Sequence, residues 1–257
     1  MRPAFGRINS RRILLLVCLS VFAVCGLTVT AERPAPKIMC RASVAPAHRQ
    51  ELTEQLRAIT GWPGLRFDGD GVLRFGEEPP TGGSQTARAL LASAQEGKNL
   101  ILIEDASGSA DVVFCRVVEG RWRSGADAKP PAFVLQIDFK DFSHVMGDRE
   151  ARAAFNAGWG AMHEIDHVVR DSVDPEGPGA AGECEELINL MRRECGLAER
   201  ADYFYNFMPG AEQSDFKTRY VRLAFERAPE QSKRRRYWLY WDAEVVGGLP
   251  TNQVAAR

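Results

Sequence analysis

Histidines and paired cysteine motifs are scarce in this sequence. Only 4 histidines and 6 cysteines occur among 257 residues, and no two cysteines have the C-x-x-C spacing. This absence argues against a zinc site made of cysteine pairs. The chain also shows no internal repeat, so we interpret residues 32–257 as a single domain that is long enough to bury one substantial core.

A large net charge is absent as well. The 33 basic and 34 acidic residues give a formal net charge of −1. Residues 1–31 contain four arginines and no acid, so residues 32–257 carry a charge of −5. This balance argues against nucleic acid or an anionic membrane as a partner. The basic run at residues 233–236 leads directly into an aromatic segment, and we interpret it as the charged start of a strand in preference to a docking patch.

The first 31 residues have the pattern of a secretory signal peptide. Four arginines precede an apolar run at 13–29, and Val29-Thr30-Ala31 resembles a small-x-small cleavage site. We therefore predict cleavage after Ala31 and a periplasmic or secreted protein without stable membrane association. An uncleaved anchor and twin-arginine export are the alternatives. In an oxidising compartment Cys40 and Cys115 could pair.

The rest of the chain predicts an α+β fold. Helices are expected at 47–59, 85–95 and 183–195, a hairpin at 64–75, strands at 99–104, 111–118, 133–138 and 237–241, and a small β-rich segment after Tyr203. Residues 148–169 contain no proline and repeat apolar positions every three or four residues, which predicts a further helix. We suggest that Gly158 and Gly160, which weaken this helix, are there to allow close packing.

The segment His163-Glu164-Ile165-Asp166-His167 has the spacing H-E-x-x-H. On a helix the two imidazoles lie one turn apart on the same side, so both can reach one metal ion. A carboxylate beside them can take a proton from a water that the metal acidifies. Chance predicts on the order of 0.005 such matches in a chain with so few histidines. The motif therefore predicts a Zn²⁺ site.

A catalytic zinc ion needs a third protein ligand. After a connection rich in glycine and proline, the helix predicted at 183–195 begins with three glutamates and is followed by Gly196 in a capping position. Glu183, Glu185 and Glu186 are all candidates, although acids in a first turn also suit the helix dipole.

Residues 155–203 resemble the gluzincin group of zinc metallopeptidases, including clostridial-neurotoxin-type and bacterial effector-type members. In this group H-E-x-x-H is completed by a Glu on the next helix, and an aliphatic and a polar residue follow that Glu. Glu185 matches this pattern, with Leu187 and Asn189 after it. Arg200 and Tyr203 match an R-x-x-Y pair that holds the charged intermediate.

The resemblance implies a zincin-like fold, in which a small mixed sheet precedes the motif helix and a second ligand-bearing helix. It implies a peptidase with His163, His167 and Glu185 as zinc ligands and Glu164 as general base. Tyr203 or Arg200 would stabilise the oxyanion, and Asn189 would brace His163. Asp166 departs from the pattern, because the fourth motif position is often aliphatic in these families.

Two other functions are compatible with the sequence. The chain could be a non-catalytic exported binding protein on a zincin-like fold, which would cleave no peptide. It could also be a zinc amidase that acts on a cell-wall linkage, because substrate preference depends on loops around the cleft.

Overall fold

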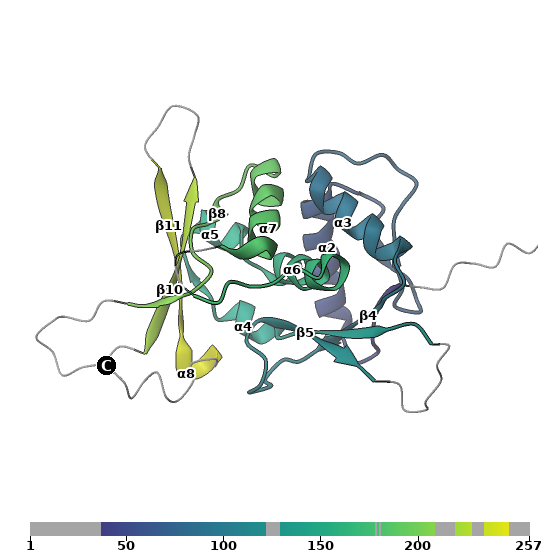
Figure 1. The fold of residues 1–257 in the computed structure, drawn as a ribbon, viewed down its shortest axis with the longest axis horizontal. Coiled ribbons are helices and arrows are strands. Elements are labelled where there is room, and N and C mark those ends of the chain that lie inside the picture. The colour runs from purple at the N-terminus through teal and green to yellow at the C-terminus, as the bar shows by residue number, and fades with distance from the viewer. Residues whose placement is uncertain are drawn as a thin grey trace, which may run out of the picture. The chain divides into compact units, whose positions relative to one another are not determined.

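Two larger β-sheets, a separate two-stranded hairpin and a group of helices around α6 (Ala157–Arg170) form the fold (Figure 1). The computed structural model describes residues 37–121, 129–177, 179, 181–208, 219–227 and 234–246. The predicted signal peptide and Lys233 lie outside these residues. The described residues belong to one compact unit, residues 36–257. Within them no helix is long and apolar enough to span a bilayer.

The first sheet has the order β1-β4-β6-β5. Strands β1 (Ile38–Cys40), β4 (Leu100–Asp105) and β6 (Ala132–Ile137) are parallel, and β5 (Cys115–Gly120) runs antiparallel to β6 at the edge, with Val117 opposite Leu135. The helices α2 (Pro46–Thr60), α3 (Gln85–Glu96) and α7 (Gly182–Glu194) surround α6, which itself contacts β5 and β6. Buried side chains of the sheet and helices form the larger core.

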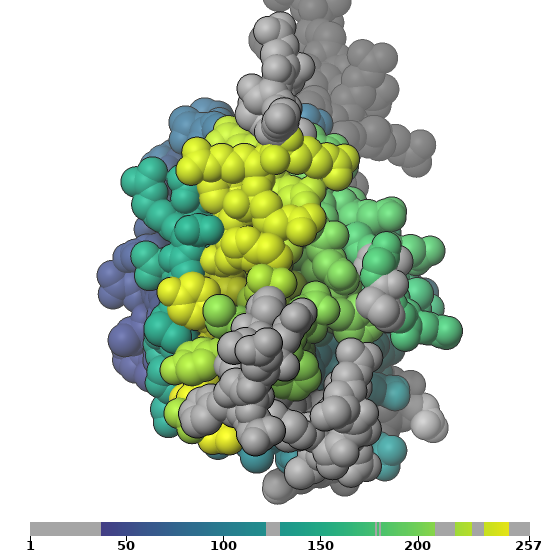
Figure 2. All heavy atoms as spheres, turned by 90° about the vertical axis from the view of Figure 1, so that its left-hand side faces the viewer, coloured from purple at the N-terminus to yellow at the C-terminus, as the bar shows by residue number. Residues whose placement is uncertain are grey.

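The second sheet consists of β7 (Met146–Gly147), β11 (Arg235–Asp242), β10 (Tyr220–Arg227) and β8 (Glu199–Arg200), with β9 (Asn206–Phe207) also paired to β10. Figure 2 shows β10 and β11 at the surface on one side of the molecule. Their inward side chains, among them Phe225 and Trp241, form a second buried cluster. Arg234 and Arg236 bond to Glu226 across this hairpin, which agrees with a charged strand start.

The α+β class and most predicted elements are confirmed, including α2, α3, α7 and the hairpin of β2 (Arg66–Phe67) and β3 (Leu73–Arg74). The short helices α4 (Phe139–Ser143) and α8 (Ala243–Val246) were not predicted.

Two predictions are wrong in detail. The helix expected at 148–169 is broken into α5 (Arg149–Ala153) and α6, because Asn156 caps α6 by accepting a hydrogen bond from the Trp159 backbone N–H. The strand expected from residue 111 begins at Cys115, because Phe114 has a left-handed φ of 61°. The sequence left open whether Cys40 and Cys115 pair, and both are free thiols.

Candidate metal centre

Two glycines allow α6 to lie close to its neighbours. A Cβ atom on Gly158 would lie 2.7 Å from Cβ of Gln55 on α2, and one on Gly160 would lie 2.6 Å from Sγ of Cys115 on β5. Any larger residue would push α6 away from the helix and the strand that flank it. The suggestion that these glycines serve close packing is confirmed.

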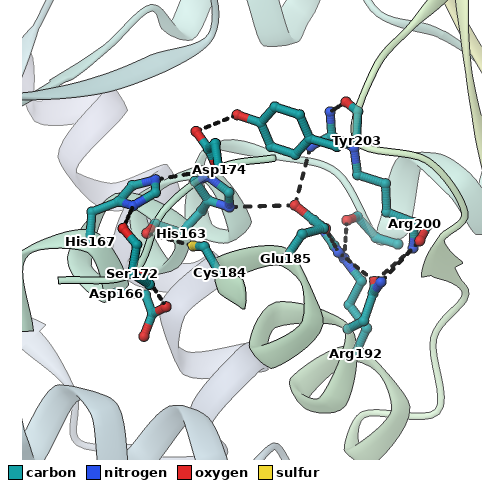
Figure 3. Close-up of polar contacts among 12 residues, drawn as sticks. His163, Asp166, His167, Ser172, Asp174, Cys184, Glu185, Arg192, Arg200 and Tyr203 are labelled. Carbon is teal, nitrogen blue, oxygen red and sulfur yellow. Dashed lines mark hydrogen bonds and ion pairs between the residues drawn. The ribbon is translucent and has the colours of Figure 1, made fainter. Parts of the chain in front are cut away.

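His163 and His167 lie on the same side of α6, with ring centroids 4.8 Å apart. Both rings direct Nε2 at the same carboxylate oxygen, Oδ1 of Asp174, at 3.1 Å from His163 and 3.6 Å from His167 (Figure 3). Asp174 belongs to the connection between α6 and α7, for which no site residue was predicted. The only signal for it was an acidic residue soon after the motif helix.

The other ring nitrogens of the two histidines are also engaged. Nδ1 of His167 lies 2.8 Å from the backbone oxygen of Ser172, and Nδ1 of His163 lies 3.4 Å from Oε2 of Glu185. With the proton on Nδ1, each Nε2 keeps a lone pair for a metal ion. In the absence of a metal ion, the hydrogen bond to Asp174 raises the pKa of His167. Burial alone would lower the pKa of His163, but its bonds to Asp174 and Glu185 raise that pKa well above its ordinary value. Metal binding would release these protons.

Asp174 is ionised in this environment. Burial alone would raise the pKa of its carboxyl group, but hydrogen bonds from His163, His167 and Tyr203 hold that pKa well below its usual range. The Tyr203 hydroxyl donates to Oδ2 of Asp174 at 2.6 Å. The carboxylate oxygen that faces the two imidazoles is therefore negatively charged and can donate a lone pair to a metal ion.

Glu185 is fully buried behind His163 instead of beside Asp174. One carboxylate oxygen accepts a hydrogen bond from Arg192, and the other lies 3.2 Å from Nη1 of Arg200. These two guanidinium groups overcome the effect of burial and hold the pKa of Glu185 well below its usual range. The predicted ligand thus contacts Nδ1 of His163, the nitrogen that faces away from Asp174.

Three other residues of α7 were candidates for the site: two alternative glutamate ligands and Asn189. Glu183 and Glu186 are exposed, as expected for residues without a ligand role. Asn189 was predicted to brace His163, and this prediction is wrong. Its side chain instead bonds to the backbone N–H and carbonyl of Arg200, at 2.7 and 2.9 Å, and accepts a hydrogen bond from Arg192.

The R-x-x-Y pair reaches the centre from the loop after α7. The Tyr203 ring stacks over His163 with centroids 6.0 Å apart, and the guanidinium carbon of Arg200 lies 4.7 Å from the Tyr203 ring centroid. Arg200 also donates to the backbone oxygen of Tyr203. Burial and the hydrogen bond to Asp174 raise the pKa of the Tyr203 hydroxyl, so it remains a proton donor.

Asp166, the departure from the family pattern, has a structural explanation. Its side chain is fully buried, and its Oδ2 accepts a hydrogen bond of 2.7 Å from the Ser172 hydroxyl. Ser172 is also the residue whose backbone oxygen holds His167. Asp166 thus ties down the first part of the connection that carries Asp174.

Glu164 lies on the side of α6 that faces the edge strand β5. It is 8% exposed, and its carboxylate lies near the backbone of Val117. Burial raises its pKa, and the neighbouring His163 and His167 partly oppose this effect. With His163 and Tyr203, Glu164 lines a cavity of about 390 Å³. A buried carboxylate with a raised pKa beside a histidine pair suits proton transfer.

Cys184 is a second possible partner for the two histidines. Its sulfur and one nitrogen of each imidazole lie within 4.8 Å of one another. However, its thiol donates to the backbone oxygen of His163, and burial raises its pKa to about 11, whereas a metal ligand must be a thiolate. Asp174 faces Nε2 of both histidines at 3.1 and 3.6 Å and is ionised, so it is the better third donor.

These donors fit a divalent cation of the zinc type. Ligand atoms of a tetrahedral zinc ion are about 3.4 Å apart at ordinary bond lengths. The distances of 3.1 and 3.6 Å between Asp174 and the two imidazoles match this spacing.

Comparisons with protein-family models, curated protein sequences and solved structures gave no match to this chain.

Proposed function

We propose that this protein is an exported zinc-dependent peptidase with a zincin-like arrangement of sheet and motif helix. The observation that carries the proposal is the convergence of Nε2 of His163, Nε2 of His167 and Oδ1 of Asp174, while Nδ1 of each imidazole is held by another group. Two imidazoles and one carboxylate are a donor set of catalytic zinc sites.

His163, His167 and Asp174 would hold the zinc ion. When bound, zinc supplies a Lewis acid that polarises a carbonyl group and lowers the pKa of water to about 7. Glu164 accepts the proton of the attacking water and passes it to the leaving amine. The hydroxyl of Tyr203 donates to Asp174 at 2.6 Å when no substrate is bound, and it would exchange this hydrogen bond for one to the oxyanion as that forms.

Glu185 and Arg200 have positioning roles in this proposal. Glu185 holds Nδ1 of His163, and two guanidinium groups keep Glu185 ionised and in place. Arg200 also holds the backbone of Tyr203. The resemblance to gluzincins thus supports the motif and the R-x-x-Y pair, whereas the contacts favour Asp174 over Glu185 as the third ligand.

A peptide substrate is supported by the position of β5. This strand is at the edge of the first sheet, and Glu164 lies against it near Val117. An extended peptide can add to such an edge through main-chain hydrogen bonds. A peptide bound there would lie beside the proposed base.

The test combines zinc content with hydrolysis. We expect about one zinc ion per chain in the purified protein and loss of that zinc in His167→Ala. His144→Ala is the matched control, because this histidine caps α4 (Phe139–Ser143) and lies outside the centre. Glu164→Gln should retain zinc, while cleavage of a peptide library falls by several orders of magnitude.

Each result separates the alternatives. Equal zinc in the wild-type protein and in His167→Ala would refute the metal centre. Zinc without cleavage of any peptide would favour a binding protein, and cleavage of a cell-wall amide alone would favour an amidase. Export is tested by mass spectrometry of exported material, which should begin at Glu32.

A further inference from the structure

The cavity beside Glu164 extends well beyond the metal centre. Its volume of about 390 Å³ lies in the range of pockets that hold small ligands. One end is formed by His163 and Glu164. The rest of the lining is mainly apolar and aromatic and includes Val113, Phe114 and Phe155, together with Leu223 and Trp241 of the second sheet.

The aromatic wall is preformed by side-chain stacking. The Phe114 ring lies 5.1 Å from Phe142, 5.0 Å from Phe155 and 5.1 Å from Trp241, measured between ring centroids. Two of these contacts are edge-to-face arrangements, which aromatic pairs favour. The wall therefore does not have to form when a ligand enters.

Phe114 adopts a backbone conformation that is unusual for its residue type. Its φ of 61° is left-handed, and such strain in a bulky residue persists only when the surroundings hold it. Its backbone N–H donates to Asp141 at 3.0 Å, and its carbonyl accepts from the backbone N–H of Asp138 at 2.8 Å. These bonds hold the ring in the wall of the cavity, which indicates a functional role for this geometry.

The charged residues that line the cavity are engaged with one another. Arg192 and Arg200 both pair with Glu185, and Arg192 also donates to Asn189 and to the carbonyl of Ala154. The guanidinium groups of the cavity already donate to acceptors within the protein. The surface that the cavity offers to a ligand is therefore mainly aromatic and apolar.

We propose that this cavity binds a large apolar or aromatic side chain of the substrate, next to the bond that is cleaved. This inference rests on the proposed function, because it takes Glu164 as the base at the cavity mouth. Burial of a phenylalanine instead of an alanine side chain favours binding by about 30-fold. A hydrophilic cell-wall amide would gain little from these walls.

The test measures binding of blocked alanine hexapeptides that carry Phe, Leu, Ala or Glu at one central position. The protein is Glu164→Gln, as purified, so that no peptide is consumed during calorimetry. We expect the Phe and Leu peptides to bind at least tenfold more tightly than the Ala and Glu peptides. Equal affinities, or no detectable binding of the Phe peptide, would overturn the proposal.

A pair of valine variants locates the binding site. Val113→Phe places a ring in the cavity and should abolish the preference for the Phe peptide, whereas Val245→Phe, on an exposed position of α8 outside the cavity lining, should preserve it. If Val113→Phe does not fold, Val113→Ala enlarges the cavity and should change the Phe-to-Leu affinity ratio. The same effect from both phenylalanine variants would contradict the assignment. Because binding is measured without turnover, its outcome is separate from zinc loss in His167→Ala.

Discussion

The third metal ligand can be identified by exchanging two carboxylates for amides. Asp174→Asn removes the charge from the oxygen that faces both imidazoles, at 3.1 and 3.6 Å. Glu185→Gln removes the charge behind His163. If Asp174 is the ligand, we expect its variant to lose more than about 100-fold in zinc affinity. Loss of a group that only orients a ligand reduces affinity by about 10- to 100-fold.

The stability of the metal-free protein should show the opposite order. Glu185 is 1% exposed and pairs with Arg192, which is 2% exposed. Its replacement leaves a buried guanidinium without its charge partner, which costs about 3 to 5 kcal/mol. The Asp174 side chain is 37% exposed, and an amide in its place keeps weaker bonds to the Tyr203 hydroxyl and to the two imidazoles, so the expected cost is smaller, about 1 to 2 kcal/mol.

The assay measures both quantities on the same variants. Zinc affinity is obtained by competition with a chelator of known affinity, and unfolding free energy by urea titration of the chelator-treated protein. Glu186→Gln, on an exposed position of α7, is the control and should change neither quantity. If Glu185→Gln empties the site while Asp174→Asn keeps its zinc, our assignment of the third ligand is refuted.

Three further predictions follow from individual contacts. Gly160→Ala should lower the unfolding free energy by about 1 to 3 kcal/mol in urea titration, because its Cβ would lie 2.6 Å from Sγ of Cys115; a more stable variant would contradict this. Asp166→Ala removes the acceptor of the Ser172 hydrogen bond and should weaken zinc binding about 10- to 100-fold, as measured by chelator competition. The double variant Asp166→Ala/Ser172→Ala should lose little more zinc affinity than the single variant. Additive losses in the double variant would show that the two residues act separately. Burial raises the pKa of Asp141 from 3.8 to about 6, so its contribution to stability is present below pH 4 and is lost as the pH rises through 6. Asp141→Asn should remove up to about 3 kcal/mol of this decline in urea titrations between pH 4 and 7, and an unchanged decline would exclude Asp141 as its source.

The features that the sequence determined by itself are those of short range. Helix periodicity predicted α2, α3 and α7, and the spacing of His163 and His167 placed both imidazoles on one side of a helix. These predictions succeeded because the relative position of residues i and i+4 follows from helix geometry alone. The α+β class followed in the same way from alternating patterns.

Tertiary structure decided which groups meet the histidine pair. Asp174 reaches it because the connection after α6 folds back, held by the bond between Asp166 and Ser172 and by Tyr203, which is 29 positions away in the chain. Backbone angles in such a connection depend on these distant contacts, which periodicity does not encode.

The same reason explains the position of Glu185. The sequence placed it in the first turn of α7, but the angle between α6 and α7 and the buried partners Arg192 and Arg200 determine which nitrogen of His163 it meets. Local sequence thus placed the two histidines and Glu164 on α6, whereas packing between distant segments decided which carboxylate faces the two Nε2 atoms, because a side chain on another segment can reach them only where the fold carries it.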